Sequence, residues 1–211
     1  MSKQQKTAAF KKEDGANTRN LIMKTARALF MEYGYRAVST RKIAEVCKIT
    51  QPALYHHFSN KQAIYLEMLR INLEQMKQSL SSIINSKRDL QECLEHIIYY
   101  LLKTYPYNLN QLFHDIKHEI ADENQKVLRQ WWEEACLAPI SALLQTASDE
   151  GSVHVPANTS VKQYAYLLMS LVSQSEMEKL ESEAEVKEKA QFLSEFIMFG
   201  ISTTFRDNKK A

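Results

Sequence analysis

The stretch STRKIAEVCKITQPALYHHFSNK, residues 39–61, predicts two short helices joined by a tight turn. Ser39 is a favourable N-cap for the first helix, because its hydroxyl can accept a hydrogen bond from a free backbone N–H. Thr50 can cap the second helix, in which Pro52 loses no hydrogen bond because it stands in the first turn. The stretch therefore predicts a helix-turn-helix motif over about 39–58.

A helix-turn-helix needs a further helix to complete its core, and the preceding residues supply one. Apolar residues recur at helical spacing over 21–33. Asn17 or Thr18 can cap the start of this helix, and Gly34 can end it because glycine tolerates positive φ. Residues 1–16 are polar, rich in Lys and without a period, which predicts a flexible basic arm.

Composition and periodicity together favour an all-α chain of about nine helices. The 211 residues include only 4 Gly and 4 Pro, which is too few for the turns of an all-β protein. We expect the arm, a three-helix domain over 17–61 and a larger helical bundle over 62–211. Pro139 lies inside one predicted helix and should kink or split it. The later helices are expected near 61–85, 90–103, 109–121, 123–148, 159–175 and 185–205.

The formal net charge of +2 hides an uneven distribution of charge. Residues 1–70 hold 13 Lys and Arg against 5 Asp and Glu, whereas residues 71–211 hold 14 against 20. A basic N-terminal third predicts an anionic partner for that part alone, such as the phosphate backbone of DNA. Chance variation in surface charge is the alternative interpretation.

Several function classes are disfavoured by what the sequence lacks. It contains no GxSxG, P-loop, GxGxxG or HExxH motif, so we expect no enzyme and no cofactor. Cys47, Cys93 and Cys136 are odd in number and far apart, which predicts reduced thiols rather than disulfides or a zinc site. We find no signal peptide and no apolar run near the roughly 20 residues of a membrane span. These features predict a cytoplasmic protein without a membrane partner.

Residues 39–61 resemble the helix-turn-helix of the TetR family of bacterial transcriptional regulators, and the resemblance extends over about 17–80. One departure is Lys48, where most members have a glycine in the turn. A residue with a side chain is mildly strained there if φ is positive. The positions that match the family pattern are Thr40, Ile43, Ala44, Leu54, Tyr55, His57, Phe58 and Lys61.

The resemblance implies two kinds of DNA contact, one to bases and one to phosphates. Arg41 and Gln51 would read bases, since Arg pairs with guanine and Gln with adenine in the major groove. Pro52 and Ala53 would offer apolar contacts to a base. Four residues would bind phosphates and fix the register: Thr40, Tyr55, His57 and Lys61. His56 could contact either phosphates or bases, and Thr50 is a further expected DNA-binding residue.

Several histidines and one tyrosine have other interpretations when taken singly. Tyr55 could be a core aromatic, and His56 with His57 could form a metal site or ordinary surface. His114 and His118 stand four residues apart on a predicted helix, a spacing that suits a pair of metal ligands. No third ligand accompanies them at a clear spacing, so we predict no metal site and expect pocket lining or exposed surface.

In the TetR family the C-terminal part binds a small effector and forms the dimer, and residues 62–211 contain side chains for both tasks. A pocket is expected around Tyr99, Leu102, Tyr105, Phe113, His114, Trp131, Trp132 and Cys136, with a solid core as the alternative. The dimer interface is expected at Val161, Ala165, Leu168, Leu171, Val172, Phe192, Phe196 and Phe199, with burial inside one subunit as the alternative.

The sequence as a whole predicts a TetR-like regulator of transcription. We expect a repressor that binds palindromic operator DNA as a homodimer and is released by a small lipophilic effector. The alternative is an effector-independent helix-turn-helix protein, such as an architectural DNA-binding protein with a solid helical body.

Overall fold

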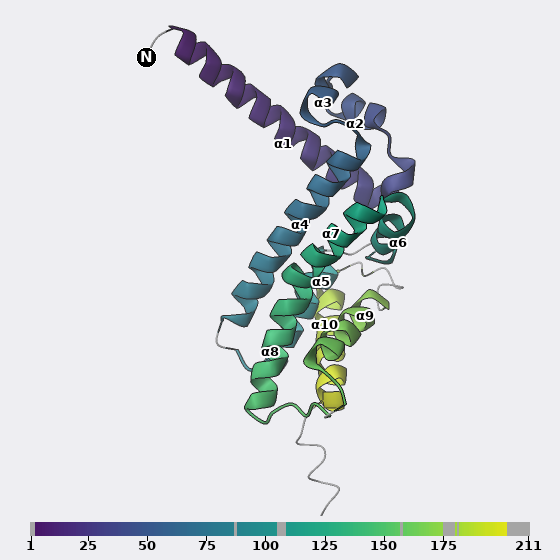
Figure 1. Ribbon diagram of the computed structural model, residues 1–211. Helices are drawn as coiled ribbons and strands as arrows, with labels where there is room; N and C mark the ends of the chain where they lie inside the picture. The colour runs from purple at the N-terminus through teal and green to yellow at the C-terminus, as the bar shows by residue number, and fades with distance from the viewer. Residues whose placement is uncertain are drawn as a thin grey trace, which may run out of the picture. The chain divides into compact units, whose positions relative to one another are not determined.

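All regular secondary structure in the described part of the chain is helical, which confirms the predicted fold class. The computed structural model describes residues 3–86, 88–104, 109–156, 158–174, 180 and 182–201 (Figure 1). A π-helical turn, η1, joins α7 to α8 without a break. The bounds are α1 Lys3–Ala37, α2 Thr40–Val46, α3 Gln51–His57, α4 Lys61–Ile84, α5 Leu90–Thr104, α6 Leu109–Glu119, α7 Asp122–Trp132, η1 Glu133–Leu137, α8 Ala138–Asp149, α9 Val161–Gln174 and α10 Glu183–Ile201.

The chain divides into two compact units that do not follow the single boundary predicted after residue 61. The first unit comprises Met1–Ile71 together with Gln111–Gln125, and the second comprises Asn72–Asn110 together with Lys126–Ala211. Most of α6 therefore belongs to the unit that holds the helix-turn-helix. The sequence could not predict this division, because contacts between distant segments leave no trace in local periodicity.

Helix α1 begins earlier than predicted. The sequence predicts an arm over 1–16 and a helix start at Asn17 or Thr18, whereas α1 already begins at Lys3. Lys, Gln and Ala dominate the added segment and have high helix propensity, so the backbone can be helical without an apolar period. The other end is as predicted, since Gly34 has a φ of 77° and breaks the helical geometry.

The core of the first unit joins α1, α2, α3 and α4. An aromatic cluster lies within it, with 5.0 Å between the ring centroids of Phe30 and Tyr65 and 4.7 Å between those of Tyr35 and Tyr65. The buried aliphatic side chains around this cluster include Ile22, Ala26, Ile43, Leu54 and Ile64.

The core of the second unit is built mainly by α5 packing along α10 and by α8 packing along α9. Helix α5 contributes one continuous apolar face, in which Leu94, Ile97, Ile98 and Leu101 are fully buried. Such a face must be covered by another element, and α10 provides the cover.

The predicted disturbance at Pro139 takes the form of a π-helical turn. The N–H of Ala138 bonds to the carbonyl of Glu133, five residues back. Proline has no N–H to donate, so it cannot continue the α-helical pattern of hydrogen bonds. The wider turn over Glu133–Leu137 lets α8 begin with Pro139 in its first turn.

Candidate nucleic-acid interface

Helices α2 and α3 are capped by the two side chains that the sequence indicated. The hydroxyl of Ser39 accepts a hydrogen bond from the N–H of Lys42 at 3.1 Å. The hydroxyl of Thr50 accepts one from the N–H of Ala53 at 3.3 Å. Each cap satisfies a backbone donor that the first turn of the helix leaves free, and so fixes where the helix begins.

The turn between α2 and α3 is a Schellman motif centred on Lys48. The N–H of Lys48 bonds to the carbonyl of Glu45 at 3.1 Å, and that of Ile49 bonds to the carbonyl of Ala44 at 3.0 Å. Lys48 has a φ of 55°, the left-handed conformation that favours glycine at this position. The strain predicted for this departure from the family pattern is therefore present.

Helix α3 presents a polar face to solvent because its apolar side chains point inward. Leu54 is buried, and so is Phe58 at the C-cap. The predicted base-reading residues Arg41 and Gln51 are exposed, as is Pro52. Of the other predicted DNA contacts, Thr50, Tyr55 and His56 are exposed, whereas Thr40, Ala53, His57 and Lys61 are partly exposed.

Two polar contacts organise this face. The hydroxyl groups of Thr40 and Tyr55 lie 3.0 Å apart and join the start of α2 to α3. The guanidinium of Arg41 forms an ion pair with the carboxylate of Glu45 at 3.1 Å, with both side chains well exposed. Exposed pairs of this kind contribute only about 0–1 kcal/mol, so the guanidinium can turn toward another acceptor at little cost.

Lys61 has partners that the sequence did not predict. Its ammonium lies 4.2 Å from the centroid of the Tyr35 ring and donates to the carbonyl of Arg36 at 3.5 Å. Partial burial lowers the pKa of Lys61, while the carboxylates of Glu119 and Asp115 act in the opposite direction. The cation is thus held beside the end of α1 as well as at the start of α4.

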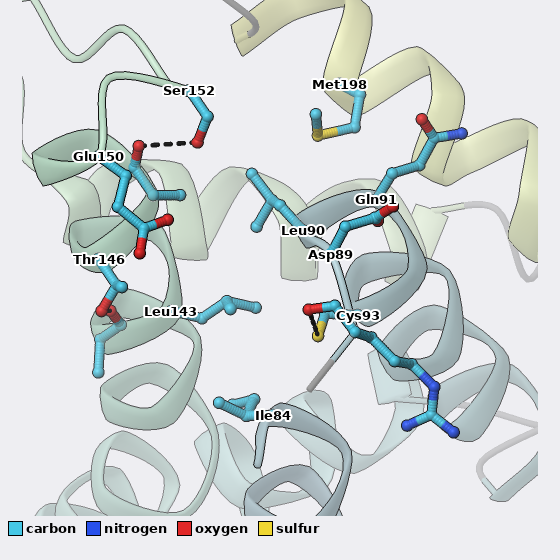
Figure 2. Close-up of a pocket in the computed structure, with 13 residues that line it drawn as sticks. Ile84, Asp89, Leu90, Gln91, Cys93, Leu143, Thr146, Glu150, Ser152 and Met198 are labelled. Atoms are coloured by element: carbon cyan, nitrogen blue, oxygen red, sulfur yellow. Dashed lines mark hydrogen bonds between the residues drawn. The ribbon is translucent and has the colours of Figure 1, made fainter. Parts of the chain in front are cut away.

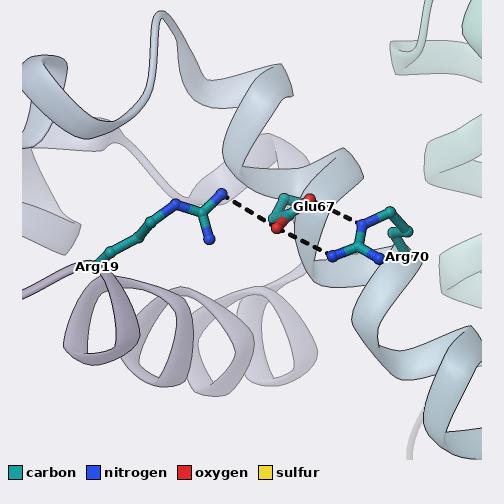
Figure 3. Close-up of polar contacts among 3 residues, drawn as sticks. All are labelled: Arg19, Glu67 and Arg70. Atoms are coloured by element: carbon teal, nitrogen blue, oxygen red, sulfur yellow. Dashed lines mark hydrogen bonds and ion pairs between the residues drawn. The ribbon is translucent and has the colours of Figure 1, made fainter. Parts of the chain in front are cut away.

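Helices α1 and α4 are tied together by an ion-pair network around Glu67 (Figure 3). Its carboxylate accepts from the guanidinium of Arg19 at 3.0 Å and from Arg70 at 3.0 and 3.2 Å. The Arg70 and Arg19 guanidinium groups together hold the pKa of Glu67 below its ordinary value. Arg19 also lies over the ring of Phe58, 4.8 Å from its centroid, so the network reaches the end of α3.

The residues predicted to line an effector pocket are distributed over both units. His114 belongs to the first unit, where its side chain is exposed. Leu102 and Cys136 are buried in the second unit, and burial raises the pKa of the Cys136 thiol to about 12. Tyr99, Trp131 and Trp132 are half-buried in the same unit, while Tyr105 and the side chain of Phe113 lie outside the described residues.

A pocket does exist in the second unit, but other residues line it (Figure 2). Its volume is about 650 Å³, which lies in the range of small-molecule sites. Leu143 and Thr146 of α8 stand on one side, Leu90 near the start of α5 stands on the other, and Met198 of α10 closes one end. The remaining lining residues are Ile84, Arg88, Asp89, Gln91, Cys93, Ala142, Ala147, Glu150 and Ser152.

The histidine pair of α6 does not complete a metal site within the described residues. The rings of His114 and His118 lie close, with 4.5 Å between their centroids. Among the side chains that the structure describes, no group of three His, Cys, Asp or Glu residues could hold a metal ion.

The predicted dimer interface needs a correction at α9. The sequence places Ala165, Leu168 and Val172 at an interface between subunits, but all three are buried within this single chain. They face inward because α9 packs against α8 and η1, which one chain supplies by itself. Val161 is half-buried, whereas the other predicted residues, Leu171, Phe192, Phe196 and Phe199, are exposed.

None of the described helices is long and apolar enough to span a membrane.

Comparison with known proteins places the helix-turn-helix in one family. The bacterial regulatory proteins of the tetR family match residues 22–68. The Transposon Tn10 TetC protein of Escherichia coli is 32% identical over 94 residues, which cover 43% of this chain and 47% of that protein. The HTH-type transcriptional repressor KstR2 of Rhodococcus jostii is 34% identical over 80 residues, 38% of this chain and 39% of that protein. The chain thus matches less than half the length of these curated relatives.

Solved structures extend the likeness to the whole fold. The ketosteroid transcriptional regulator KstR2 of Mycobacterium tuberculosis has a TM-score of 0.69 at 18% identity, covering 88% of this chain and 95% of that one. The TetR family regulator PfmR of Thermus thermophilus has a TM-score of 0.68 at 21% identity, covering 84% and 93%. Both of these neighbours are transcriptional regulators. Residues 22–68 of this chain are similar to the tetR family of bacterial regulatory proteins, and the fold of the chain is similar to that of these two regulators.

Proposed function

We propose that the chain is a transcriptional repressor that binds operator DNA through α2 and α3. The observation that carries the proposal is the exposed polar face at the start of α3, held in place by two side-chain caps and a Schellman turn. An α-helix fits the major groove of B-DNA, where the base edges carry a readable pattern of donors and acceptors. The match over residues 22–68 supports the same role.

The side chains of this face divide into base readers and phosphate binders. Arg41 and Gln51 are exposed and long enough to reach base edges, and the ion pair of Arg41 with Glu45 costs little to open. Pro52 and Ala53 stand beside Gln51 in the first turn of α3 and offer apolar contacts. The proposed phosphate binders are Thr40, Thr50, Tyr55, His56, His57 and Lys61.

A random pool of duplexes, taken through rounds of selection with the full chain, tests this function directly. The expected result is an enriched, palindromic site. Fluorescence anisotropy then compares Arg41→Ala and Gln51→Ala on that site and on a scrambled duplex. Each substitution should weaken binding to the selected site by about 1–3 kcal/mol and change binding to the scrambled duplex much less.

Lys77→Ala is a matched control, because Lys77 is exposed on α4 outside the helix-turn-helix. It should bind both duplexes as the wild type does. Failure of the selection to enrich any site would refute DNA recognition. Equal binding of the selected site by both variants and the control would refute the assignment of Arg41 and Gln51 as base readers.

The proposal includes a homodimer formed through the outer faces of α9 and α10. Phe192 and Phe196 are 59% and 58% exposed, and their rings stack with 6.4 Å between centroids. Leu167 on the outer face of α9 is 60% exposed. Exposed apolar side chains grouped on a helix face favour a protein interface. A two-fold dimer would place two recognition helices about 34–36 Å apart, one turn of DNA.

A small lipophilic effector that releases the DNA completes the proposal. Tyr99, Trp131 and Trp132 are half-buried in the second unit and remain the proposed aromatic lining. A competing candidate, an effector-independent DNA-binding protein, is favoured by the complete burial of Cys136 and Leu102, which is typical of a solid core. A thermal-shift screen of lipophilic compounds decides between them, since a ligand that binds the folded state raises the melting temperature.

A further inference from the structure

A buried carboxylate connects α6 to the end of α1 across 80 residues of sequence. Asp115 is 3% exposed, and its Oδ2 accepts a hydrogen bond from the backbone N–H of Tyr35 at 2.7 Å. Both residues belong to the first unit, which also holds the helix-turn-helix. Burial of a charge is costly unless hydrogen bonds compensate it, so the bond to Tyr35 is a strong constraint on both partners.

The carboxylate of Asp115 accepts a hydrogen bond at a break in the helical backbone of α1. Tyr35 directly follows Gly34, whose φ of 77° breaks the helical geometry of α1. A backbone N–H at such a break has lost the regular geometry of the helix, and a buried N–H without an acceptor is destabilising. Asp115 supplies that acceptor and thereby fixes the direction in which the chain leaves α1 toward α2.

The same short segment also positions the start of α4. The ring of Tyr35 packs against Tyr65 of α4, with 4.7 Å between centroids. Lys61 is the first residue of α4, and its ammonium lies over the Tyr35 ring, 4.2 Å from the ring centroid. The same ammonium donates a hydrogen bond to the carbonyl of Arg36 at 3.5 Å. Helices α2 and α3 lie in the chain between these two contacts, so the segment 35–36 is tied to both ends of the helix-turn-helix.

We propose that Asp115 is a positioning residue for DNA binding. It cannot itself reach DNA from its buried place, and it acts by holding Tyr35, whose ring and the neighbouring carbonyl of Arg36 hold the ammonium of Lys61 at the end of α1. Withdrawal of the carboxylate would leave α2, α3 and the cation of Lys61 less well oriented toward phosphates. This inference rests on the proposed function, because it concerns affinity for DNA.

The test compares three variants of the full chain on the duplex that the wild type selects from the random pool. Asp115→Ala removes the acceptor, and Asp115→Asn keeps an amide oxygen but removes the charge. Glu123→Ala is the matched control, since it removes an exposed carboxylate from the same unit. Titration at duplex concentrations far above Kd gives the active fraction of each variant, and this separates affinity from loss of folded protein.

We expect Asp115→Ala to bind at least about tenfold more weakly at an undiminished active fraction, which corresponds to the 1.4 kcal/mol of a tenfold change. Asp115→Asn should be weaker by about threefold, because neutral hydrogen bonds are roughly half as strong as charged ones. Amide hydrogen exchange at Tyr35 should accelerate in the same order.

Equal affinity of both Asp115 variants and Glu123→Ala would overturn the inference. If Asp115→Ala fails to fold, the comparison of Asp115→Asn with Glu123→Ala tests the inference by itself. Equal DNA affinity of these two variants would then overturn the inference. Failure of the wild type to select any duplex is a different result, which contradicts the proposed function itself.

Discussion

The hydroxyl groups of Thr40 and Tyr55 lie 3.0 Å apart and hydrogen-bond the first residue of α2 to the middle of the recognition helix α3. Tyr55 is 47% exposed, which excludes the alternative interpretation of its ring as a core aromatic. The pair holds two proposed phosphate binders side by side on the exposed face.

Replacement of Tyr55 by Phe should therefore separate DNA affinity from stability. The lost hydrogen bond is exposed, so the free energy of unfolding should change by no more than about 0.5 kcal/mol. Affinity for DNA should fall by about 1 kcal/mol, equally for selected and scrambled duplexes, because phosphate contacts carry no sequence information. Anisotropy titrations on both duplexes measure this, and a loss confined to the selected duplex would contradict the assignment.

Lys48→Gly should stabilise the protein. Lys48 has a φ of 55° at the position of the Schellman motif where glycine is usual. Relief of this strain, less the added freedom of the unfolded chain, should contribute about 0.5–1 kcal/mol. Calorimetry should show a melting temperature about 1–4 °C higher.

Lys42→Gly is the matched control for this substitution, since Lys42 stands in the regular geometry of α2. There the same change should destabilise by about 1 kcal/mol. A Lys48→Gly protein that melts below the wild type would show that the lysine side chain compensates for its own backbone strain.

The ion pairs of Glu67 predict a difference in stability between the wild type and Glu67→Gln that disappears in acid. Hydrogen bonds from Arg70 and Arg19 lower the pKa of this carboxyl from its ordinary value of 4.5. A lowered folded-state pKa contributes stability that is present above the unfolded value and is lost as pH falls through the folded value. Glu67→Gln should thus unfold more readily near neutral pH, by about 0.5–1 kcal/mol, since both arginines are substantially exposed.

Urea denaturation of wild type and Glu67→Gln at several pH values checks this prediction. The two curves should be furthest apart at pH 6–7, begin to converge as the pH falls below the ordinary glutamate pKa of about 4.5, and meet below the lowered pKa of the folded state. Gln75→Ala, an exposed change elsewhere on α4 that alters no charge, should show no such convergence. A difference between wild type and Glu67→Gln that persists unchanged in acid would contradict the electrostatic origin.

Cys136 should resist thiol reagents for as long as the protein is folded. Its side chain is fully buried against the sulfur of Met169, 3.4 Å away, and burial raises its pKa to about 12. Only the thiolate reacts with maleimides and disulfide reagents, so almost none is available at pH 8. Mass spectrometry should find Cys136 unmodified without denaturant and modified in 6 M guanidinium, and rapid labelling of the native protein would contradict this burial.

The helix-turn-helix could be predicted from the sequence because its determinants are local. Caps, the proline in a first turn and the apolar positions of two short helices lie within about twenty residues of one another. Ser39, Thr50 and Pro52 each do in the structure what their chemistry indicates. The contact between Tyr35 and Asp115 joins residues 80 positions apart, and no local pattern indicates it. The place of α6 in the first unit could therefore not be predicted from the sequence.

The second unit shows a different limit of sequence reasoning. An apolar stripe on a helix predicts burial but does not say what covers it. On α9, the stripe of Ala165, Leu168 and Val172 is covered by the same chain, whereas on α10 Phe192 and Phe196 stay exposed. Helix α10 carries apolar residues on both sides, and α5 covers only one of them.

The exposed side of α10 leads to the last prediction, which concerns assembly. Phe196→Lys places a charge among stacked phenyl rings and should raise the dimer dissociation constant by at least about 100-fold, as expected for an aromatic residue central to an interface. Gln191→Lys adds the same charge to the same helix beside this face and should leave assembly unchanged. Sedimentation equilibrium should give the wild type and Gln191→Lys twice the 24.5 kDa of one chain and give Phe196→Lys a single chain mass at low micromolar concentration. A Phe196→Lys protein that keeps the doubled mass would place the interface elsewhere, and a wild type of single mass would remove the dimer from the proposed function.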